Sequence, residues 1–142
     1  MWKLDISLEE SLAAVVVTLR GDVDGPTYVE AMAAWFGRYP ELAALDRVHD
    51  LMAYAGSIGH DDLRQLAGCL PEPALLAPAV TVIASPDRFF PTWARSFRSL
   101  APGRAFLVEP SLPEALAALL RHRSAAKEAA PAAPFSPPPP AR

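Results

Sequence analysis

Apolar and polar residues alternate at the start of the chain, and continuous apolar runs follow. Trp2, Leu4 and Ile6 stand at every second position, which is the period of a strand with one solvated face. The run AAVVVTLR at residues 13–20 is apolar and β-branched, as in a strand covered on both faces. Because only the short segment LEES separates the two strands, we expect them to pair antiparallel.

Strands and helices are predicted to alternate along the rest of the core. Further strands are expected at residues 44–51, 79–85 and 104–109. Apolar spacing predicts helices at residues 26–37, 60–70, 87–100 and 113–122. Ser111 and Glu114 have the S-x-x-E spacing of a capping box before the last helix. The prediction is an α/β fold with a mixed sheet of about five strands and about four helices, in the order ββα-βα-βα-βα.

The end of the sequence has a different composition. From Arg123 onward it reads RSAAKEAAPAAPFSPPPPAR, with six prolines and Phe135 as its one large apolar residue. Such a segment has too little apolar surface to form a core. We therefore predict one domain at residues 1–122 and a disordered tail at 123–142, with polyproline-II character at Pro137 to Pro140.

Composition narrows the class of protein. A hydrophobic content of 51% is enough for a packed interior, and no apolar run approaches the roughly 20 residues that span a bilayer. The segment MWKLDISLEE has no cationic stretch followed by an apolar one, so it does not resemble a secretion signal. These features favour a cytoplasmic protein without a transmembrane segment.

Charge and cysteine content exclude several kinds of site. The net charge of −3 gives no global field to attract a polyanion, so nucleic acid is not an expected partner. Cys69 is the single cysteine and is expected in the core, which excludes an internal disulfide and a zinc site of several thiolates. No cofactor or metal ion is predicted. A solvated basic face, able to dock an acidic partner, is expected at Arg88, Arg95, Arg98 and Arg104.

Polar residues gather after three of the predicted strands. If these strands run parallel, the loops at 21–25, 51–60 and 85–90 meet at one edge of the sheet, where α/β proteins favour ligand sites. This edge, called the rim below, brings together Asp22, Asp24, Asp50, Ser57, His60, Asp61, Asp62 and Arg88. The acids also have structural explanations as helix caps, dipole partners and strand-end acceptors. A histidine in the first turn of an exposed helix is more often solvated than reactive.

The rim does not contain a complete reactive set. An aspartate ending the third strand would suit a two-component receiver domain, but a receiver begins βα and needs a lysine late in the sheet, whereas none lies between Lys3 and Lys127. Ser57 lacks the G-x-S-x-G elbow of a hydrolase, and the glycines do not form G-x-G-x-x-G. No catalytic residue is predicted, and the chain is not expected to be an enzyme.

Several short segments, taken in order, resemble a known family. They are His49-Asp50-Leu51, YAGSIGHDDLRQLA, VTVIAS, WARSF and SLPEALAALL. This order resembles the SpoIIAA-like group of STAS/SEC14-type bacterial domains over residues 1 to about 122. The resemblance implies a small α/β domain with a mixed sheet, of a kind that mainly regulates by binding a partner protein or a small ligand.

The resemblance also implies a candidate modification site. Anti-sigma-factor antagonists of the wider STAS group have a phosphorylatable serine, within an Asp-Ser pair, at the start of the helix after the third strand. Ser57 lies in the corresponding connection and follows Gly56. Ser57 is thus the candidate phosphorylation site.

Two functional hypotheses remain open. The first is a non-enzymatic regulatory or protein-interaction module of the STAS-like type. The alternative is a domain that binds a small apolar or anionic molecule, or a lipid, in a pocket at the rim. The candidate contacts are Asp22, Asp24, Asp50, Ser57, His60 and Arg88. The sequence leaves the oligomeric state open.

Overall fold

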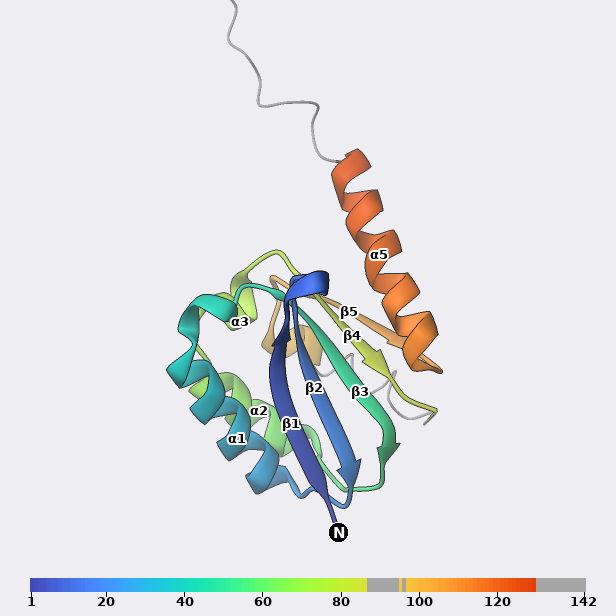
Figure 1. Cartoon of the computed structure of the whole chain (residues 1–142). Helices are drawn as coiled ribbons and strands as arrows, with labels where there is room; N and C mark the ends of the chain where they lie inside the picture. Colours follow the sequence, from blue (N-terminus) through green and yellow to red (C-terminus); the bar gives the residue numbers. More distant parts are fainter. Residues whose placement is uncertain (87–94, 96, 130–142) are drawn as a thin grey trace, which may run out of the picture.

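A five-stranded sheet with helices on both faces forms the centre of the computed structural model, which describes residues 1–86, 95 and 97–129 (Figure 1). The strands are β1 (Lys3–Glu9), β2 (Ala14–Gly21), β3 (Asp46–Tyr54), β4 (Val80–Ala84) and β5 (Ala105–Glu109). The helices are α1 (Gly25–Arg38), α2 (His60–Cys69), α3 (Pro73–Leu76) and α5 (Leu112–Ala129), with 3₁₀ turns η1 (Glu10–Leu12) and η2 (Pro40–Leu42). The predicted α/β class with a mixed sheet is confirmed.

The strands lie in sequence order across the sheet. β1 pairs antiparallel with β2, and β2, β3, β4 and β5 pair parallel. The predicted hairpin and the predicted parallel strands are both confirmed. Most of the expected helix at 87–100 lies outside the described residues. Within this range residues 95 and 97–100 are described, and they are helical. The connection at 71–78, rich in proline, contains the short helix α3, since Pro73 in a first turn needs no N–H partner.

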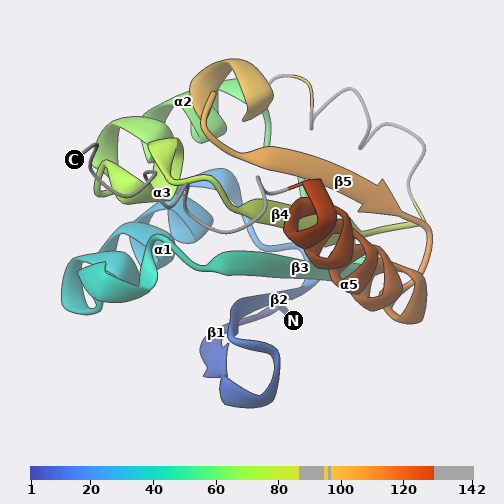
Figure 2. The same ribbon diagram turned by 90° about the horizontal axis from the view of Figure 1, so that it is seen from above.

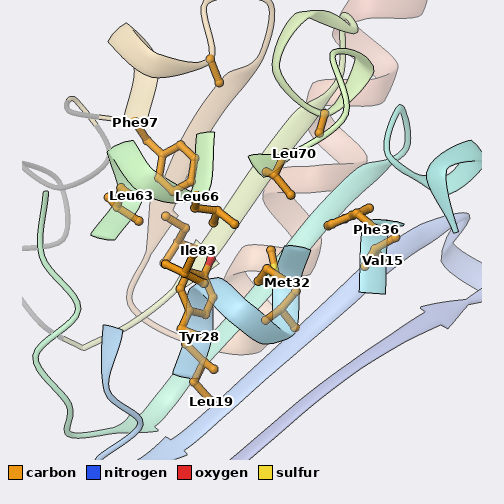
Figure 3. Packing of buried hydrophobic residues seen from close by; sticks show 14 of the residues in the cluster. Val15, Leu19, Tyr28, Met32, Phe36, Leu63, Leu66, Leu70, Ile83 and Phe97 are labelled. Carbon is orange, nitrogen blue, oxygen red and sulfur yellow. The ribbon is translucent and has the colours of Figure 1, made fainter. Parts of the chain in front are cut away.

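Two cores lie on opposite faces of the sheet. α1 and α2 cover one face and α5 covers the other (Figures 1 and 2). Successive residues of β2 alternate between them: Val15, Val17 and Leu19 belong to the core beneath α1, and Ala14 belongs to the core beneath α5. Tyr28, Met32 and Phe36 form the buried stripe of α1, which packs against that sheet face (Figure 3). A strand covered on both faces is what the continuous apolar run predicts.

The last helix starts where the capping box predicts and ends later than expected. The backbone N–H of Glu114 donates to Ser111 Oγ at 3.3 Å, so Ser111 caps the helix. α5 continues to Ala129, seven residues past the predicted boundary at His122. Alanine-rich sequence favours this extension, and Arg123 Nε donates to Asp46 Oδ2 at 2.8 Å. Residues 130–142 lie outside the described residues, and their disorder stays a prediction.

Two side chains lie elsewhere than the sequence suggested. Cys69 is exposed rather than in the core, because Leu63, Leu66 and Leu70 occupy the buried side of α2 and its vicinity. Arg104 is buried, with 4% of its surface exposed, and so does not belong to a solvated basic face. Its guanidinium reaches three oxygens in the interior, at Leu45, Ala43 and Thr81.

The extension of α5 leads to a first prediction. Truncation after His122 removes Arg123, which also donates to the Ala13 carbonyl at 3.3 Å, whereas truncation after Ala129 keeps both contacts. We expect the shorter chain to have a free energy of unfolding about 1 kcal/mol lower than the longer one, because a half-buried charged pair is lost. Urea denaturation of the two chains measures the difference. Equal stabilities would show that residues 123–129 do not contribute to the domain.

Candidate functional site

The acids of the rim are bound to backbone amides. Asp24 Oδ1 accepts the Thr27 N–H at 2.7 Å and caps α1, and this bond lowers the pKa of the Asp24 carboxyl. Asp62 Oδ2 accepts the Gly59 N–H at 2.9 Å at the start of α2. Both carboxylates therefore hold helix N-termini in place. The hydrogen bonds of Asp24 and Asp62 therefore support a structural role for these two acids at the starts of helices.

A tyrosine that the sequence reasoning did not single out holds the rim together. Tyr54 is the last residue of β3, and its hydroxyl accepts the Ile58 N–H at 2.7 Å. The same hydroxyl lies 3.5 Å from the Val23 carbonyl, to which it donates. Burial raises the pKa of Tyr54, so the hydroxyl stays protonated as a donor. One side chain thus joins the loop after β3 to the segment between β2 and α1.

The two loops of the rim pack closely against each other. Ala55 N–H donates to the Gly21 carbonyl at 2.8 Å and extends the pairing of β2 with β3. A Cβ added at Gly56 would collide with the Val23 carbonyl and the Tyr54 ring, and one added at Gly25 would collide with the Asp62 carboxyl. The absence of side chains at Gly25 and Gly56 therefore allows the segments 21–25 and 54–62 to form one surface.

The predicted rim residues divide into four groups. Asp22, Ser57, His60 and Asp61 are exposed on the joined loops, while Asp24 and Asp62 cap the helices beside them. Asp50 does not join them, because β3 runs on to Tyr54 and places Asp50 inside the strand, paired with Thr18 and Ala84. Its carboxylate accepts the Met52 N–H at 3.1 Å. Arg88 lies outside the described residues.

A second polar group is buried beneath α1 and α2, and sequence reasoning missed it. Arg47 and His49 point from β3 into this core, each with 2% of its surface exposed. His49 Nε2 lies 3.1 Å from the Tyr28 hydroxyl, and Arg47 donates to the Ala74 carbonyl of α3 and stacks over the Phe36 ring, 5.3 Å from its centroid. Only the fold shows these side chains to be internal, since the short polar-looking stretch DRVHD gives no such signal.

Burial governs the protonation of this group. It lowers the pKa of His49 to about 3, with the positive charges of Arg47 and Arg104 acting in the same direction. It also lowers the pKa of Arg47 to about 9 and of Arg104 to about 10, and raises that of Tyr28. At neutral pH His49 is therefore an uncharged hydrogen-bond partner of Tyr28. The group connects α1, α3 and β3 and is structural.

Described residues line three of the depressions on the surface. The first, about 440 Å³, lies between β1 and α1 and is lined by Leu4, Ile6, Ala31, Ala34, Trp35, Arg38 and Tyr39. The second, about 420 Å³, shares Trp35 and Tyr39 with it and adds Ser7, Leu8, Glu41 and Leu42. The third, about 320 Å³, lies between β5 and α5 and is lined by Leu107, Glu109, Ala118, Arg121, His122 and Ala125. These hollows are separate from the exposed residues of the rim.

The described residues contain neither a metal-binding cluster nor a helix that could span a membrane. Within residues 1–86, 95 and 97–129, no three histidine, cysteine, aspartate or glutamate side chains gather closely enough to hold a metal ion. Over the same described part of the chain, the helices lack the length and apolar character needed to cross a bilayer.

Two solved structures resemble this fold. One is an anti-sigma factor antagonist from Mycobacterium paratuberculosis, with a TM-score of 0.52 and 20% identity over 84% of this chain and 95% of that one. The other is an uncharacterized protein with a SpoIIAA-like fold from Shewanella loihica PV-4, with a TM-score of 0.55 and 16% identity over 83% and 93%. No protein-family model matches the sequence, and no curated protein matches it. At these identities the likeness concerns the fold, and the SpoIIAA-like fold implied by the motifs is confirmed.

The anchoring role of Tyr54 can be tested by removing one oxygen. Tyr54→Phe deletes the acceptor of the Ile58 N–H and the donor to Val23, which should lower the free energy of unfolding by about 1 kcal/mol. Hydrogen exchange at the Ile58 amide should accelerate more than exchange in β2 or β3. Tyr39→Phe, a hydroxyl deletion at the far end of α1, is the matched control. Unchanged exchange at Ile58 would contradict the assignment.

The buried histidine predicts a pH dependence of stability. Because the pKa of His49 falls to about 3 in the folded protein, the unfolded chain binds a proton between about pH 6.5 and pH 3 that the folded protein does not. Its contribution to stability is complete above about pH 6.5 and declines as the pH falls through that window. His49→Gln keeps an amide near Tyr28 but cannot titrate there.

Denaturant unfolding at a series of pH values measures this dependence. The unmodified protein should lose more stability than His49→Gln between about pH 7 and about pH 4, since the variant lacks the titrating group. His60→Gln, at the exposed start of α2, should follow the unmodified protein. Parallel curves for the unmodified protein and His49→Gln would show that the buried imidazole does not drive the effect.

Proposed function

We propose that this chain is a non-enzymatic regulatory module of the cytoplasm that binds a partner protein through the rim. The proposal is supported by the contrast between the hydrogen-bonded and the exposed polar side chains of the rim. Asp24 and Asp62 are engaged at helix N-termini, while Ser57 is exposed on a loop that Tyr54 anchors and His60 is exposed at the start of α2. A fixed loop that presents polar side chains to solvent suits recognition better than turnover.

The fold supports the same kind of function. One structure with this fold is an anti-sigma factor antagonist, a protein named for opposing another protein. The likeness in fold is not itself evidence of a shared partner. It makes regulated binding to a protein the first function to test, and the resemblance of the short motifs supports Ser57, in the loop after β3, as the candidate phosphorylation site.

Charge indicates the chemistry of the partner. Asp22 and Asp61 are exposed beside Ser57 and His60, and the carboxylates of Asp24 and Asp62 lie at the same edge. Within this acidic surface Ser57 is an uncharged position, so a partner that covers its hydroxyl has no charge to desolvate there. Phosphorylation of Ser57 would add a charge of about −1.5 to −2 to this surface, on a short loop beside α2. The modification would therefore change the affinity of a partner that contacts the loop.

The other readings of the rim receive less support. Hydrolysis by Ser57 would need an oriented base, and His60 is exposed in the first turn of α2. A ligand pocket at the rim would have to open between residues 51–60 and 85–90, a region that lies partly outside the described residues. These readings are retained as outcomes of the experiment below.

Substitution at Ser57 tests the proposal. Ser57→Asp should reduce recovery of the partner about tenfold in a pull-down from host lysate, because it adds charge to the binding loop. Ser57→Ala and His60→Ala should retain binding. Ser124→Asp, which adds the same charge to the exposed face of α5, is the matched control. Mass spectrometry of the purified protein looks for phosphate on Ser57.

The same variants identify the contrary results. Equal recovery by Ser57→Asp and Ser124→Asp would remove the rim from the partner interface. Loss of a measurable turnover in folded Ser57→Ala or His60→Ala would establish an enzyme. A small molecule retained by the native protein in mass spectrometry, and lost in Ser57→Asp, would favour the ligand-binding reading.

A further inference from the structure

β1 forms one edge of the sheet (Figure 1). Within the part of the chain that the structure describes, no strand pairs with the outer side of β1, so its outward N–H and C=O groups have no strand partner there. Proteins commonly protect such an edge with a proline, a bulge or a very short strand. β1 has seven residues, KLDISLE, without proline, and its register with β2 is unbroken from Lys3 to Glu9. The backbone of β1 is therefore suited to pair with one more strand.

One side of β1 is apolar and only partly covered by α1. Leu4, Ile6 and Leu8 lie at every second position and so point to the same side of the sheet. The hollows of about 440 Å³ and about 420 Å³ lie beside these residues and share Trp35 and Tyr39. Leu8 is 38% exposed. A strand that pairs with β1 can therefore bury apolar surface as well as satisfy the backbone.

The sequence of β1 is complementary to itself in an antiparallel pair. Consider two copies of the strand with Ile6 of one opposite Ile6 of the other. In this register Leu4 lies opposite Leu8 of the second copy. Lys3 lies opposite Glu9, and by symmetry each of these pairs occurs twice. Apolar side chains and opposite charges placed directly across two strands stabilise their pairing.

The neighbouring registers bring like charges together. Because the apolar sides of the two copies must coincide, the second strand can shift only by two residues at a time. A shift in one direction places Asp5 opposite Asp5 of the second copy, and a shift in the other places Asp5 opposite Glu9. Like charges directly opposite each other destabilise a strand pair. In the register centred on Ile6, Asp5 faces the uncharged Ser7, and all seven residues of β1 are paired.

The surface beside α1 contains a second pair of opposite charges. The two-fold axis of this antiparallel pair is perpendicular to the sheet, so α1 lies on the same side in both copies. Arg38 lines the hollow beside Leu4, and Glu41 lines the hollow beside Leu8. Because Leu4 faces Leu8 of the second copy, the hollow with Arg38 adjoins the hollow with Glu41 of that copy. The surfaces of the two copies therefore match in charge on this side as well.

We propose that the chain forms a symmetric dimer in which β1 pairs antiparallel with β1 of a second copy, centred on Ile6. The two five-stranded sheets then join into one, and β1 is no longer an edge. The strands of the two copies run in opposite directions, so the two rims lie at opposite ends of the joined sheet. Binding of a partner at one rim therefore does not require the dimer to separate.

Sedimentation equilibrium and hydrogen exchange at increasing concentrations of the full chain test the proposal. The apparent mass should rise from 15.2 kDa towards twice that value. Backbone amides of β1 should exchange more slowly at high concentration than at low concentration, whereas those of β5, at the other edge of the sheet, should exchange equally at both. A chain that stays monomeric up to about 1 mM, or a dimer in which the amides of β1 gain no protection, would overturn the proposal.

An exchange of charges tests the register. Lys3 and Glu9 are both exposed, so substitutions there leave the core intact. Lys3→Glu places two carboxylates opposite each other and Glu9→Lys places two ammonium groups there, so each variant should raise the dissociation constant of the dimer at least about tenfold. The double variant restores opposite charges and should return the constant close to that of the unmodified chain. A double variant as weak as the single variants would show that Lys3 does not face Glu9.

A charge on the apolar side of β1 tests the rest of the interface. Leu8→Lys should abolish the dimer, because it directs an ammonium group at the apolar side of the second copy. Leu120→Lys, at a residue of α5 that is 53% exposed, is the matched control and should retain the dimer. Equal dimerisation by the two variants would remove this side of β1 from the interface. If the purified chain is monomeric and recovers from host lysate another protein that Leu8→Lys does not recover, the edge binds a foreign strand, and the dimer is wrong.

Discussion

The parallel pairing of β2 with β3 is the constraint on which the other parts of the molecule depend. Its register runs from Ala14 beside Asp46 to Gly21 beside Tyr54. At the first end, Asp46 accepts hydrogen bonds from Val80 of β4 and from Arg123 of α5. At the other end, Tyr54 fixes the loops of the rim. A shift of one residue would reverse the faces of β3 and break both attachments at once.

Buried polar side chains on β3 and next to β5 make the register of β3 specific. Arg47 and Arg104 reach backbone carbonyls of α3 and of the η2–β3 connection, and His49 meets Tyr28 of α1. Each guanidinium loses hydration on burial, so its hydrogen bonds offset a large desolvation penalty more than they add net stability. Their effect is geometric, since the contacts of His49 with Tyr28 and of Arg47 with Ala74 hold α1 and α3 against β3.

The sequence predicted those features that depend on local periodicity. The alternation in β1 and the apolar run of β2 gave the hairpin and the two-sided burial, and Ser111 gave the start of α5. It did not predict features set by distant partners. β3 continues past Asp50 because its later residues pair with β2. Arg104 is buried because it donates hydrogen bonds to the carbonyls of Ala43 and Leu45, which are distant in the sequence. Tyr54 joins the two loops of the rim only because the fold brings Val23 and Ile58 within hydrogen-bond distance of its hydroxyl.

Helix α1 joins the rim to the opposite end of the sheet. The N-terminus of α1 lies at the rim, capped by Asp24, and its last turns carry Trp35, which lies beside β1. Movement of α1 in response to binding at the rim would require the helix to have two packed arrangements on the sheet. Its buried stripe and the bond from Tyr28 to His49 fit one arrangement, and close-packed interiors resist sliding. The packing of α1 therefore fixes the segment that it presents at the rim.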